Sequence, residues 1–367
     1  MDALTTPSNW QRVRLGDICE IVKGQQINKI SLNNTDKYPV INGGIDFLGY
    51  TNKFNVSKNT IAISEGGTCG YVRFMTSDFW SGGHNYSLQK ISNKVNNLCL
   101  YHILKSYEKD IMKLGVGSGL KNIQLKVLKD FEIPLPPLNE QIAIANILSD
   151  LDRYLYSLRA LILKKESVKK ALSFELLSQR KRLKGFNQAW QRVRLGDIFF
   201  ITAGGDLSKP HYSNTKQSDF NYPIYSNAIE KKGLYGYSSF FIIKNKSITI
   251  TSRGTIGVAF FRDYPYVPIG RLLVLQPKIS NIDCRFYTEY INSKVKFNTE
   301  QTTIPQLTIP KVALCEIPLP PLNEQIAIAN ILSALDSEII SLKNKKRQFE
   351  NIKKALNHDL MSAKIRV

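Results

Sequence analysis

The chain of 367 residues contains two pairs of identical internal repeats. The stretch WQRVRLGDI at residues 10–18 recurs unchanged at residues 190–198, and EIPLPPLNEQIAIANILS at residues 132–149 recurs unchanged at residues 316–333. The copies are offset by 180 and 184 residues, so the chain is a tandem duplication. Because such self-similarity is the signature of a repeated structural unit, we expect a pseudo-twofold molecule in which one architecture occurs twice.

The inserts between these repeats have diverged at most positions. The matches that survive are Tyr38-Pro39 with Tyr222-Pro223, Gly67-Thr68-Cys69-Gly70 with Gly254-Thr255-Ile256-Gly257, and Gly83 with Gly270. A frame that is unchanged around divergent inserts indicates that one scaffold carries two different recognition surfaces.

Each insert has the pattern of a strand-rich domain. Short runs of β-branched and aromatic residues are separated by Gly, Asn and Pro, which is typical of strands and turns. Examples are Thr60–Ser64, Tyr71–Met75, Ser247–Thr251 and Leu272–Leu275. We therefore expect compact α+β domains whose glycine-rich loops carry the binding residues.

The second repeat begins a long helix in each half. Pro134, Pro136 and Pro137 predict an extended lead-in, after which Asn139 is the expected N-cap and Glu140 lies at the positive end of the helix dipole. A heptad seam follows, with spacings of three and four residues and seven apolar positions of nine in each copy. Its positions are Leu148, Leu151, Leu155, Leu158, Ile162, Lys165, Lys169, Leu172 and Leu176, then Leu332, Leu335, Ile339, Leu342, Lys346, Phe349, Lys353, Leu356 and Leu360.

Each helix is expected to extend over about 40 residues, or roughly 60 Å. An amphipathic helix of this length needs a partner, and the chain contains two with matching seams. The seams predict an antiparallel coiled coil, the arrangement that places the inserts at opposite ends. In the alternative, each helix packs on its own globular domain. That alternative fits a sustained heptad less well, because helices in globular proteins average only about 11–12 residues.

Four lysines interrupt the apolar seam: Lys165 and Lys169 in the first copy, and Lys346 and Lys353 in the second. They could fix the register of the two helices, mark a place where the pair opens to admit a partner, or lie at a solvated edge of the seam. The sequence leaves these three explanations open.

The charge of the chain points to a polyanionic partner. Lys and Arg number 50 against 30 Asp and Glu, a net charge of +20, and nucleic acid is the commonest partner of so basic a protein. The excess is +5 in residues 1–138, +5 in 139–186, +7 in 187–322 and +3 in 323–367. A molecule that lies along a duplex needs basic contacts in each of its parts. The alternative is a basic surface that only aids solubility.

The cysteines and the apolar runs indicate the compartment. Five cysteines are widely spaced, with no Cys-x-x-Cys and no clustered histidines, so neither a zinc site nor a disulfide framework is expected. The first ten residues lack the features of a signal peptide, and no apolar run approaches a membrane span. We expect a protein of the cytoplasm with no membrane partner.

The order insert, helix, insert, helix carries a family resemblance. The W-x-x-V-x-L-G-D-I opening at Trp10–Ile18 and Trp190–Ile198 and the I-P-L-P-P-L-x-E-Q helix start at Ile133–Gln141 and Ile317–Gln325 resemble the specificity subunit of type I restriction–modification systems. The resemblance covers essentially the whole chain.

The resemblance implies an α+β fold with two target recognition domains, each reading one half of a split double-stranded DNA site. The implied boundaries are 1–138 and 187–322 for the recognition domains and 139–186 and 323–367 for the helical spacers. The paired helices would hold the halves at a fixed separation and dock two methyltransferase subunits, and restriction subunits with translocase and nuclease activity would join. The resemblance places S-adenosylmethionine in the methyltransferase subunits, places ATP and Mg in the restriction subunits, and assigns no cofactor or metal to this chain.

The expected DNA-contacting residues are polar or flanked by glycine and lie at equivalent places in the two inserts. Arg253 and Arg271 could fork onto guanine, while Asn and Gln suit adenine. Each residue could instead form a turn or contact a phosphate. The first set is Asn42, Gly43, Gly44, Ser64, Glu65, Thr68, His84, Asn85, Lys121 and Asn122, and the second is Ser226, Asn227, Ser252, Arg253, Thr255, Arg271, Thr303 and Gln306.

No residue is assigned a catalytic role. The G-V-G-S-G stretch at residues 115–119 is a weak match to a nucleotide loop, and it has no counterpart in the second copy. The sequence has no G-x-x-x-x-G-K-[ST] loop and no Asn-Pro-Pro-aromatic motif. Two alternatives remain: an adaptor whose inserts bind protein or glycan, and a single-chain restriction enzyme with an unrecognised catalytic site. Salt-dependent binding to duplex DNA would argue against the first, and an assay with S-adenosylmethionine and Mg²⁺ would expose the second.

Overall fold

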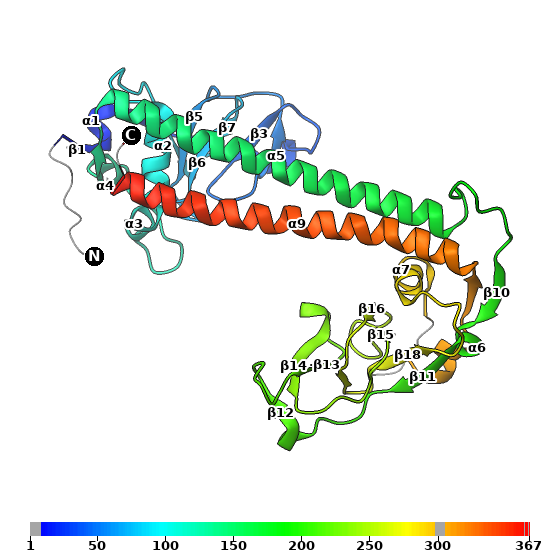
Figure 1. The fold of residues 1–367 in the computed structure, drawn as a ribbon. Helices are drawn as coiled ribbons and strands as arrows, with labels where there is room; N and C mark the ends of the chain where they lie inside the picture. Colours follow the sequence, from blue (N-terminus) through cyan, green and yellow to red (C-terminus); the bar gives the residue numbers. More distant parts are fainter. Residues whose placement is uncertain (1–8, 298–304, 363, 366) are drawn as a thin grey trace. The chain divides into compact units, whose positions relative to one another are not determined.

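The computed structural model describes residues 9–297, 305–362, 364–365 and 367, so Thr303 lies outside the described residues. The chain forms two units of similar construction (Figure 1). Unit 1 consists of residues 1–160 and 344–367, and unit 2 of residues 161–343. Each unit thus combines one predicted recognition domain with a segment of each long helix.

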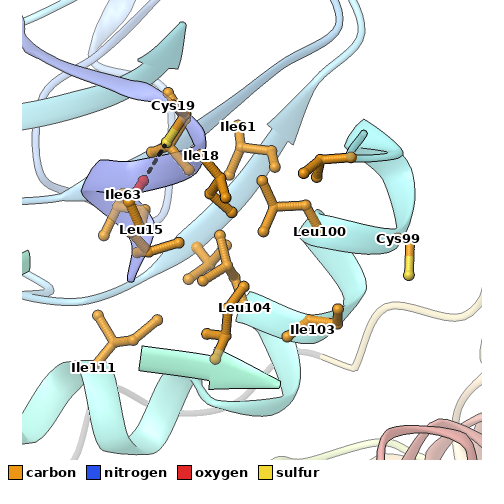
Figure 2. Close-up of a cluster of buried hydrophobic side chains, with 14 of the residues drawn as sticks. Leu15, Ile18, Cys19, Ile61, Ile63, Cys99, Leu100, Ile103, Leu104 and Ile111 are labelled. Carbon is orange, nitrogen blue, oxygen red and sulfur yellow. Dashed lines mark hydrogen bonds between the residues drawn. The ribbon is translucent and has the colours of Figure 1, made fainter. Parts of the chain in front are cut away.

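Unit 1 is built around a four-stranded antiparallel sheet in the order β2-β8-β5-β6, next to a smaller mixed sheet in the order β4-β3-β7. The elements within residues 9–135 are β1 (Gln11–Arg14), α1 (Leu15–Ile18), β2 (Glu20–Lys23), η1 (Lys29–Ser31), β3 (Tyr38–Ile41), β4 (Gly49–Thr51), β5 (Thr60–Ser64), β6 (Val72–Met75), β7 (Trp80–Ser81), β8 (Asn85–Gln89), α2 (Asn97–Ser106), α3 (Glu108–Lys113), α4 (Leu125–Lys129) and β9 (Glu132–Leu135). Ile61 and Ile63 on the larger sheet face Leu100 and Leu104 of α2 in the core (Figure 2).

Unit 2 repeats this plan. Its four-stranded sheets have the orders β11-β18-β15-β16 and β12-β14-β13-β17. Its elements before the second long helix are β10 (Gln191–Arg194), α6 (Leu195–Ile198), β11 (Phe199–Ala203), η2 (Lys209–His211), β12 (Tyr212–Ser213), β13 (Tyr222–Tyr225), η3 (Glu230–Gly233), β14 (Leu234–Ser238), β15 (Ser247–Ile250), β16 (Ala259–Arg262), β17 (Val267–Pro268), β18 (Leu273–Pro277), α7 (Cys284–Lys294), α8 (Ile309–Ala313) and β19 (Glu316–Leu319). The predicted α+β class with tandem repetition is confirmed.

The identical repeats hold together the first and last segments of each insert. In unit 1, β1 pairs antiparallel with β9, and the indole Nε1 of Trp10 donates to the buried carboxylate of Glu140 at 3.2 Å. The next residue, Gln141, accepts a hydrogen bond from the backbone N–H of Asn96 at 2.7 Å and so fixes the start of α2. Unit 2 repeats this contact, since Gln325 accepts from the N–H of Asp283 at 2.8 Å. These contacts explain why the Trp and the Glu-Gln pair occur in both copies.

The long helices are α5 (Leu138–Leu177) and α9 (Leu322–Met361), each of 40 residues as predicted. The expected N-cap is wrong: α5 starts at Leu138, and the N–H of Gln141 donates to the carbonyl of Pro137 at 2.9 Å. Pro137 therefore takes the N-cap place, because its carbonyl accepts the first hydrogen bond of the helix. Asn139 therefore lies inside the first turn.

Within each unit, a segment of α5 lies beside a segment of α9 and runs antiparallel to it (Figure 1). In unit 1, Asp152 pairs with Lys353, and Arg159 pairs with Glu350 at 3.1 Å, so the partner number falls as the residue number rises. In unit 2, Lys165 pairs with Glu338 at 2.8 Å and Lys169 pairs with Asp336 at 2.6 Å. This is the antiparallel coiled coil that the seams predicted.

The seam side chains are all buried or half-buried. The apolar ones are Leu148, Leu151, Leu155, Leu158, Ile162, Leu172 and Leu176 on α5, and Leu332, Leu335, Ile339, Leu342, Phe349, Leu356 and Leu360 on α9.

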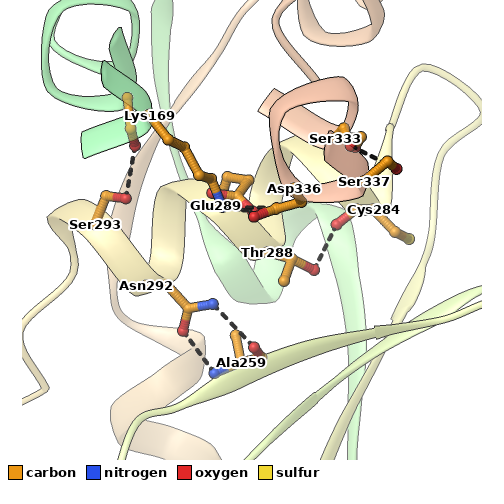
Figure 3. Close-up of polar contacts among 11 residues, drawn as sticks. Lys169, Ala259, Cys284, Thr288, Glu289, Asn292, Ser293, Ser333, Asp336 and Ser337 are labelled. Atoms are coloured by element: carbon orange, nitrogen blue, oxygen red, sulfur yellow. Dashed lines mark hydrogen bonds and ion pairs between the residues drawn. The ribbon is translucent and has the colours of Figure 1, made fainter. Parts of the chain in front are cut away.

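Three of the four seam lysines make ion pairs between the two helices. Lys169 contacts Asp336 and also Glu289 of α7, at 3.3 Å (Figure 3). Lys353 occupies the equivalent place in unit 1 and pairs with Asp152. Lys346 pairs along its own helix with Glu350 at 3.4 Å. A displaced register would separate these pairs, so their placement supports the explanation that the lysines fix the register.

The sequence predicted no membrane span, but one stretch of α9 is long and apolar. A window of α9 has a mean hydropathy of 1.3, which by length and composition meets the criterion for a membrane-spanning helix. Such a criterion is weak evidence, since core helices also meet it. Ile328, Leu332 and Ile339 of α9 are buried inside the protein, and they belong to the 28% of this window that is buried, whereas Ile326 and Ile340 are exposed.

Candidate nucleic-acid interface

The predicted DNA-contacting residues of unit 1 come from four loops that meet at one end of its sheets. The Oδ1 atom of Asn42 accepts a hydrogen bond from the N–H of His84 at 2.9 Å, and the carbonyl of Gly43 accepts one from the N–H of Thr68 at 2.8 Å. The N–H of Glu65 donates to the carbonyl of His84 at 3.0 Å, and its carbonyl accepts from Ile123 at 2.9 Å. Residues far apart in sequence therefore form one surface.

Two glycines allow these loops to approach closely. A Cβ atom on Gly66 would lie 2.2 Å from Oδ1 of Asn122, and one on Gly82 would lie 2.6 Å from Oδ1 of Asn42. The exposed amide of Asn122 could turn away from a side chain at Gly66. At Gly82 the Cβ atom of Asn42 also lies within 2.8 Å, so a side chain there would push the loops apart.

Unit 2 builds a corresponding surface from different side chains. The Oδ1 atom of Asn227 accepts from the N–H of Ser252 at 2.7 Å, and its Nδ2 donates to the carbonyl of Gly270 at 2.6 Å. The hydroxyl of Ser252 donates to the carbonyl of Arg271 at 2.7 Å. The guanidinium of Arg253 donates to Oε1 of Gln306 at 3.2 Å, which brings the last loop to the same place.

The predicted residues divide by exposure into three groups. Ser64, Glu65, Asn85 and Ser252 have buried side chains, and Gly43 is buried too. Asn42, Thr68, Ser226, Asn227 and Gln306 are half-buried. The exposed ones are Gly44, His84, Lys121, Asn122, Arg253, Thr255 and Arg271. The buried residues hold the loops, whereas the exposed ones form the face that a ligand can reach.

Glu65 is a buried carboxylate at the centre of the unit 1 surface. Its Oε1 atom accepts from Lys23 at 2.6 Å and from the hydroxyl of Tyr86 at 3.1 Å. Its Oε2 atom has no hydrogen-bond partner among the described residues, and Nδ1 of His84 lies 4.0 Å away. Burial, followed by the charge of Glu65, raises the pKa of Tyr86 and keeps its hydroxyl protonated. The equivalent residue in unit 2 is Ser252, so the two surfaces differ in charge at their centres.

The sequence prediction missed two exposed lysines beside the unit 2 surface. Lys231 and Lys232 have φ values of +47° and +55°, a region that side chains rarely adopt. The buried guanidinium of Arg262 donates to the carbonyl of Lys232 at 2.5 Å and lies 3.6 Å from the ring centroid of Tyr225. The hydrogen bond from Arg262 therefore holds the loop in its strained conformation. Only the Lys-Lys-Gly order indicated a turn here.

No group of three or more metal-ligating side chains occurs in the described parts of the chain. Each copy of the scaffold thus carries a loop surface formed by different polar and charged side chains. Arg, Asn and Gln are among the side chains that can form hydrogen bonds with base edges.

Comparison with known proteins identifies the family. The family model described as "Type I restriction modification DNA specificity domain" matches residues 7–166 and again residues 187–351. The chain therefore belongs to the type I restriction–modification DNA specificity family, as the repeated motifs predicted.

Individual relatives agree over nearly the whole chain. A putative type I specificity subunit of Mycoplasma genitalium is 28% identical over 322 residues, covering 84% of this chain and 82% of that protein. The type I restriction enzyme MjaVIII specificity subunit of Methanocaldococcus jannaschii is 26% identical over 412 residues, covering 100% of this chain and 95% of that protein.

Solved structures show the same fold. The crystal structure of a type I restriction–modification S subunit from M. genitalium has a TM-score of 0.77 at 26% identity and covers 97% of each chain. A structure from a study of type I complex assembly shares the fold, with a TM-score of 0.52 at 14% identity.

Proposed function

We propose that this chain is the specificity subunit of a type I restriction–modification complex in the cytoplasm. Each recognition domain reads one half of a split, asymmetric double-stranded DNA target. The observation that carries this proposal is the contrast between the two loop surfaces. Glu65 and His84 occupy positions in unit 1 that Ser252 and Arg271 occupy in unit 2, although the flanking repeats are identical. Different side chains at equivalent places suit two different half-sites.

The chain recognises DNA, and its partners carry the chemistry. S-adenosylmethionine would be bound by two methyltransferase subunits, and ATP and Mg by restriction subunits. The repeats support docking of the same partner at two places. Asn139 and Ile142 are exposed on α5, and so are the identical Asn323 and Ile326 on α9. Packing inside the chain does not require identical residues at exposed positions, whereas binding of two copies of one partner does.

The direct test is to co-express the chain with the methyltransferase encoded beside it and to map methylated adenines across the genome. We expect one split motif with two defined halves separated by unspecified bases. A stable complex that methylates nothing would contradict the proposal and favour the adaptor alternative. Methylation by the purified chain alone would favour the single-chain enzyme.

The length of the unspecified spacer should follow the length of the helices. Adding one heptad to α5 within residues 155–175, and one to the facing part of α9, lengthens both helices by about 10 Å while the seams stay in phase. We expect the mapped spacer to grow by about three base pairs, with both half-site sequences unchanged. An unchanged spacer or altered half-sites would contradict the idea that the helices set the spacing.

A further inference from the structure

Two hairpins, one in each unit, carry an exposed isoleucine at their tips. In unit 1, the turn between β3 and β4 presents Ile45, which is 53% exposed, followed by exposed Asp46. In unit 2, the turn between β13 and β14 presents Ile229, which is 45% exposed, followed by exposed Glu230. The two isoleucines are 184 residues apart, as are the Tyr-Pro pairs that begin the two hairpins. An exposed apolar residue therefore occurs at one place in two inserts that differ at most positions.

Both tips project from firmly held bases. In unit 1, the N–H of Leu48 donates to the carbonyl of Val40 at 2.8 Å, and Gly43 is bonded to the loop of Thr68. In unit 2, the N–H of Ser226 donates to the carbonyl of Gly233 at 2.9 Å. The N–H of Lys232 donates to the carbonyl of Ile229 at 3.0 Å. Because the turns are fixed at both ends, each isoleucine is presented to a ligand without a large loss of conformational entropy.

The surroundings of the tips favour DNA as the ligand. Each turn continues directly from the predicted reading loops, since Asn42 precedes Ile45 by three residues and Ser226 precedes Ile229 by three. Ile229 is followed by exposed Lys231 and Lys232, and in unit 1 the guanidinium of Arg73 lies 5.1 Å from the ring centroid of Phe47. Cations beside an apolar tip suit insertion into a polyanion.

The acidic residue after each isoleucine indicates which part of the DNA the tip contacts. A carboxylate is repelled by phosphates, so a tip that carries one does not rest on the DNA backbone. A carboxylate can accept a hydrogen bond from an exocyclic amino group at a base edge. Isoleucine is one of the side chains that proteins insert between base steps to unstack them.

We propose that Ile45 and Ile229 are wedges that enter the duplex, one at each half-site, and unstack a base step there. This inference rests on the proposed function, in which both domains bind DNA. Unstacking of a base step by an isoleucine does not depend on the half-site sequence. This independence accounts for the presence of an isoleucine in both divergent inserts. Unstacking would lower the energy needed to extrude a base for modification by a partner subunit.

The test uses the complex co-purified with its methyltransferase subunits and a duplex that carries the mapped target. Permanganate reactivity reports thymines that have lost their stacking, and fluorescence anisotropy reports binding to target and to non-target duplexes. The variants are Ile45→Ala and Ile229→Ala, with Ile45→Met as a conservative change. Ile30→Ala, at a position 91% exposed in unit 1, and Ile340→Ala, at a position 54% exposed on α9, are matched controls.

We expect Ile45→Ala to abolish thymine reactivity in one half-site and Ile229→Ala to abolish it in the other. Affinity for the target should fall about tenfold in each case, because truncation removes most of a buried aliphatic side chain. Ile45→Met and both controls should behave as the wild type.

Three other outcomes are distinguishable. Selective binding with unchanged reactivity in both alanine variants would overturn the wedge and leave the proposed function intact. Loss of the methyltransferase subunits from the Ile45→Ala complex before DNA is added would overturn it in favour of a protein contact. No selective binding by the wild-type complex would reject the proposed function, and the wedge with it.

Discussion

Replacing residues 20–130 with the corresponding segment of another specificity subunit should change one half of the DNA target and leave the other half intact. All the predicted contact loops of unit 1 lie within this segment. The segment starts after the LGDI of the opening repeat and ends just before β9. Since β1 pairs with β9, the two ends of the insert lie side by side, and a foreign insert meets the same two attachment points.

The readout for this exchange is the map of methylated sites, and the matched exchange of residues 200–314 serves as its control. That second exchange should alter the half-site that the first left unchanged. If either exchange altered both halves, the two domains would not read the DNA independently. The donor segment should keep an N-cap residue equivalent to Asn96, whose N–H is bound by Gln141 of the retained helix.

Acidification from pH 7.5 to pH 5 should destabilise unit 1 through His102. This side chain on α2 is 3% exposed, and its pKa is lowered to about 4, first by burial and then by the charge of Lys353, against an opposing effect of Asp152. Above the ordinary pKa of 6.5, His102 is neutral in both the folded and the unfolded chain, so its full contribution to stability is present. Between pH 6.5 and about 4 only the unfolded chain gains a proton, and the free energy of unfolding falls, by roughly 2 kcal/mol at pH 5.

Hydrogen exchange of α2 peptides, corrected for the intrinsic effect of pH, measures this change in unit 1 alone. His102→Gln should remove most of the loss, and a variant that keeps the full loss would contradict the assignment.

The equivalent residue in unit 2 provides a comparison of opposite sign. Burial raises the pKa of Glu289 on α7, against the opposing effect of Lys169. The stability contributed by protonated Glu289 is present below the ordinary pKa of 4.5 and is lost as the pH rises through the raised value. Exchange at α7 should therefore not show the loss between pH 6.5 and 5 that α2 shows. We therefore expect the two units to respond differently to pH, although they share a scaffold, because this one position holds His102 in unit 1 and Glu289 in unit 2.

Much of the architecture follows from local sequence patterns. The exact repeats predicted two similar units, and the run Thr60–Ser64 coincides with β5. The seams predicted two helices of about 40 residues, and both have 40. These features can be predicted from the sequence because strand alternation and the heptad pattern depend only on residues that are close to each other in sequence. The helix start was misplaced by two residues because Asn139 is a preferred N-cap residue type, whereas the carbonyl of Pro137 accepts the first hydrogen bond of the helix.

Which of the predicted contact residues are buried depends on contacts between distant parts of the chain, and no local pattern encodes these contacts. Glu65 looks like an exposed loop residue in the sequence. It is buried because Lys23, 42 positions earlier, and Tyr86, 21 positions later, both contact it. Ile45 is exposed because no segment of the described chain folds over the hairpin tip to cover it. The sequence by itself determined the duplicated frame and its two long helices. Only the tertiary structure decided which side chains in the predicted contact loops hold those loops together and which are exposed, because burial is set by residues that are distant along the chain.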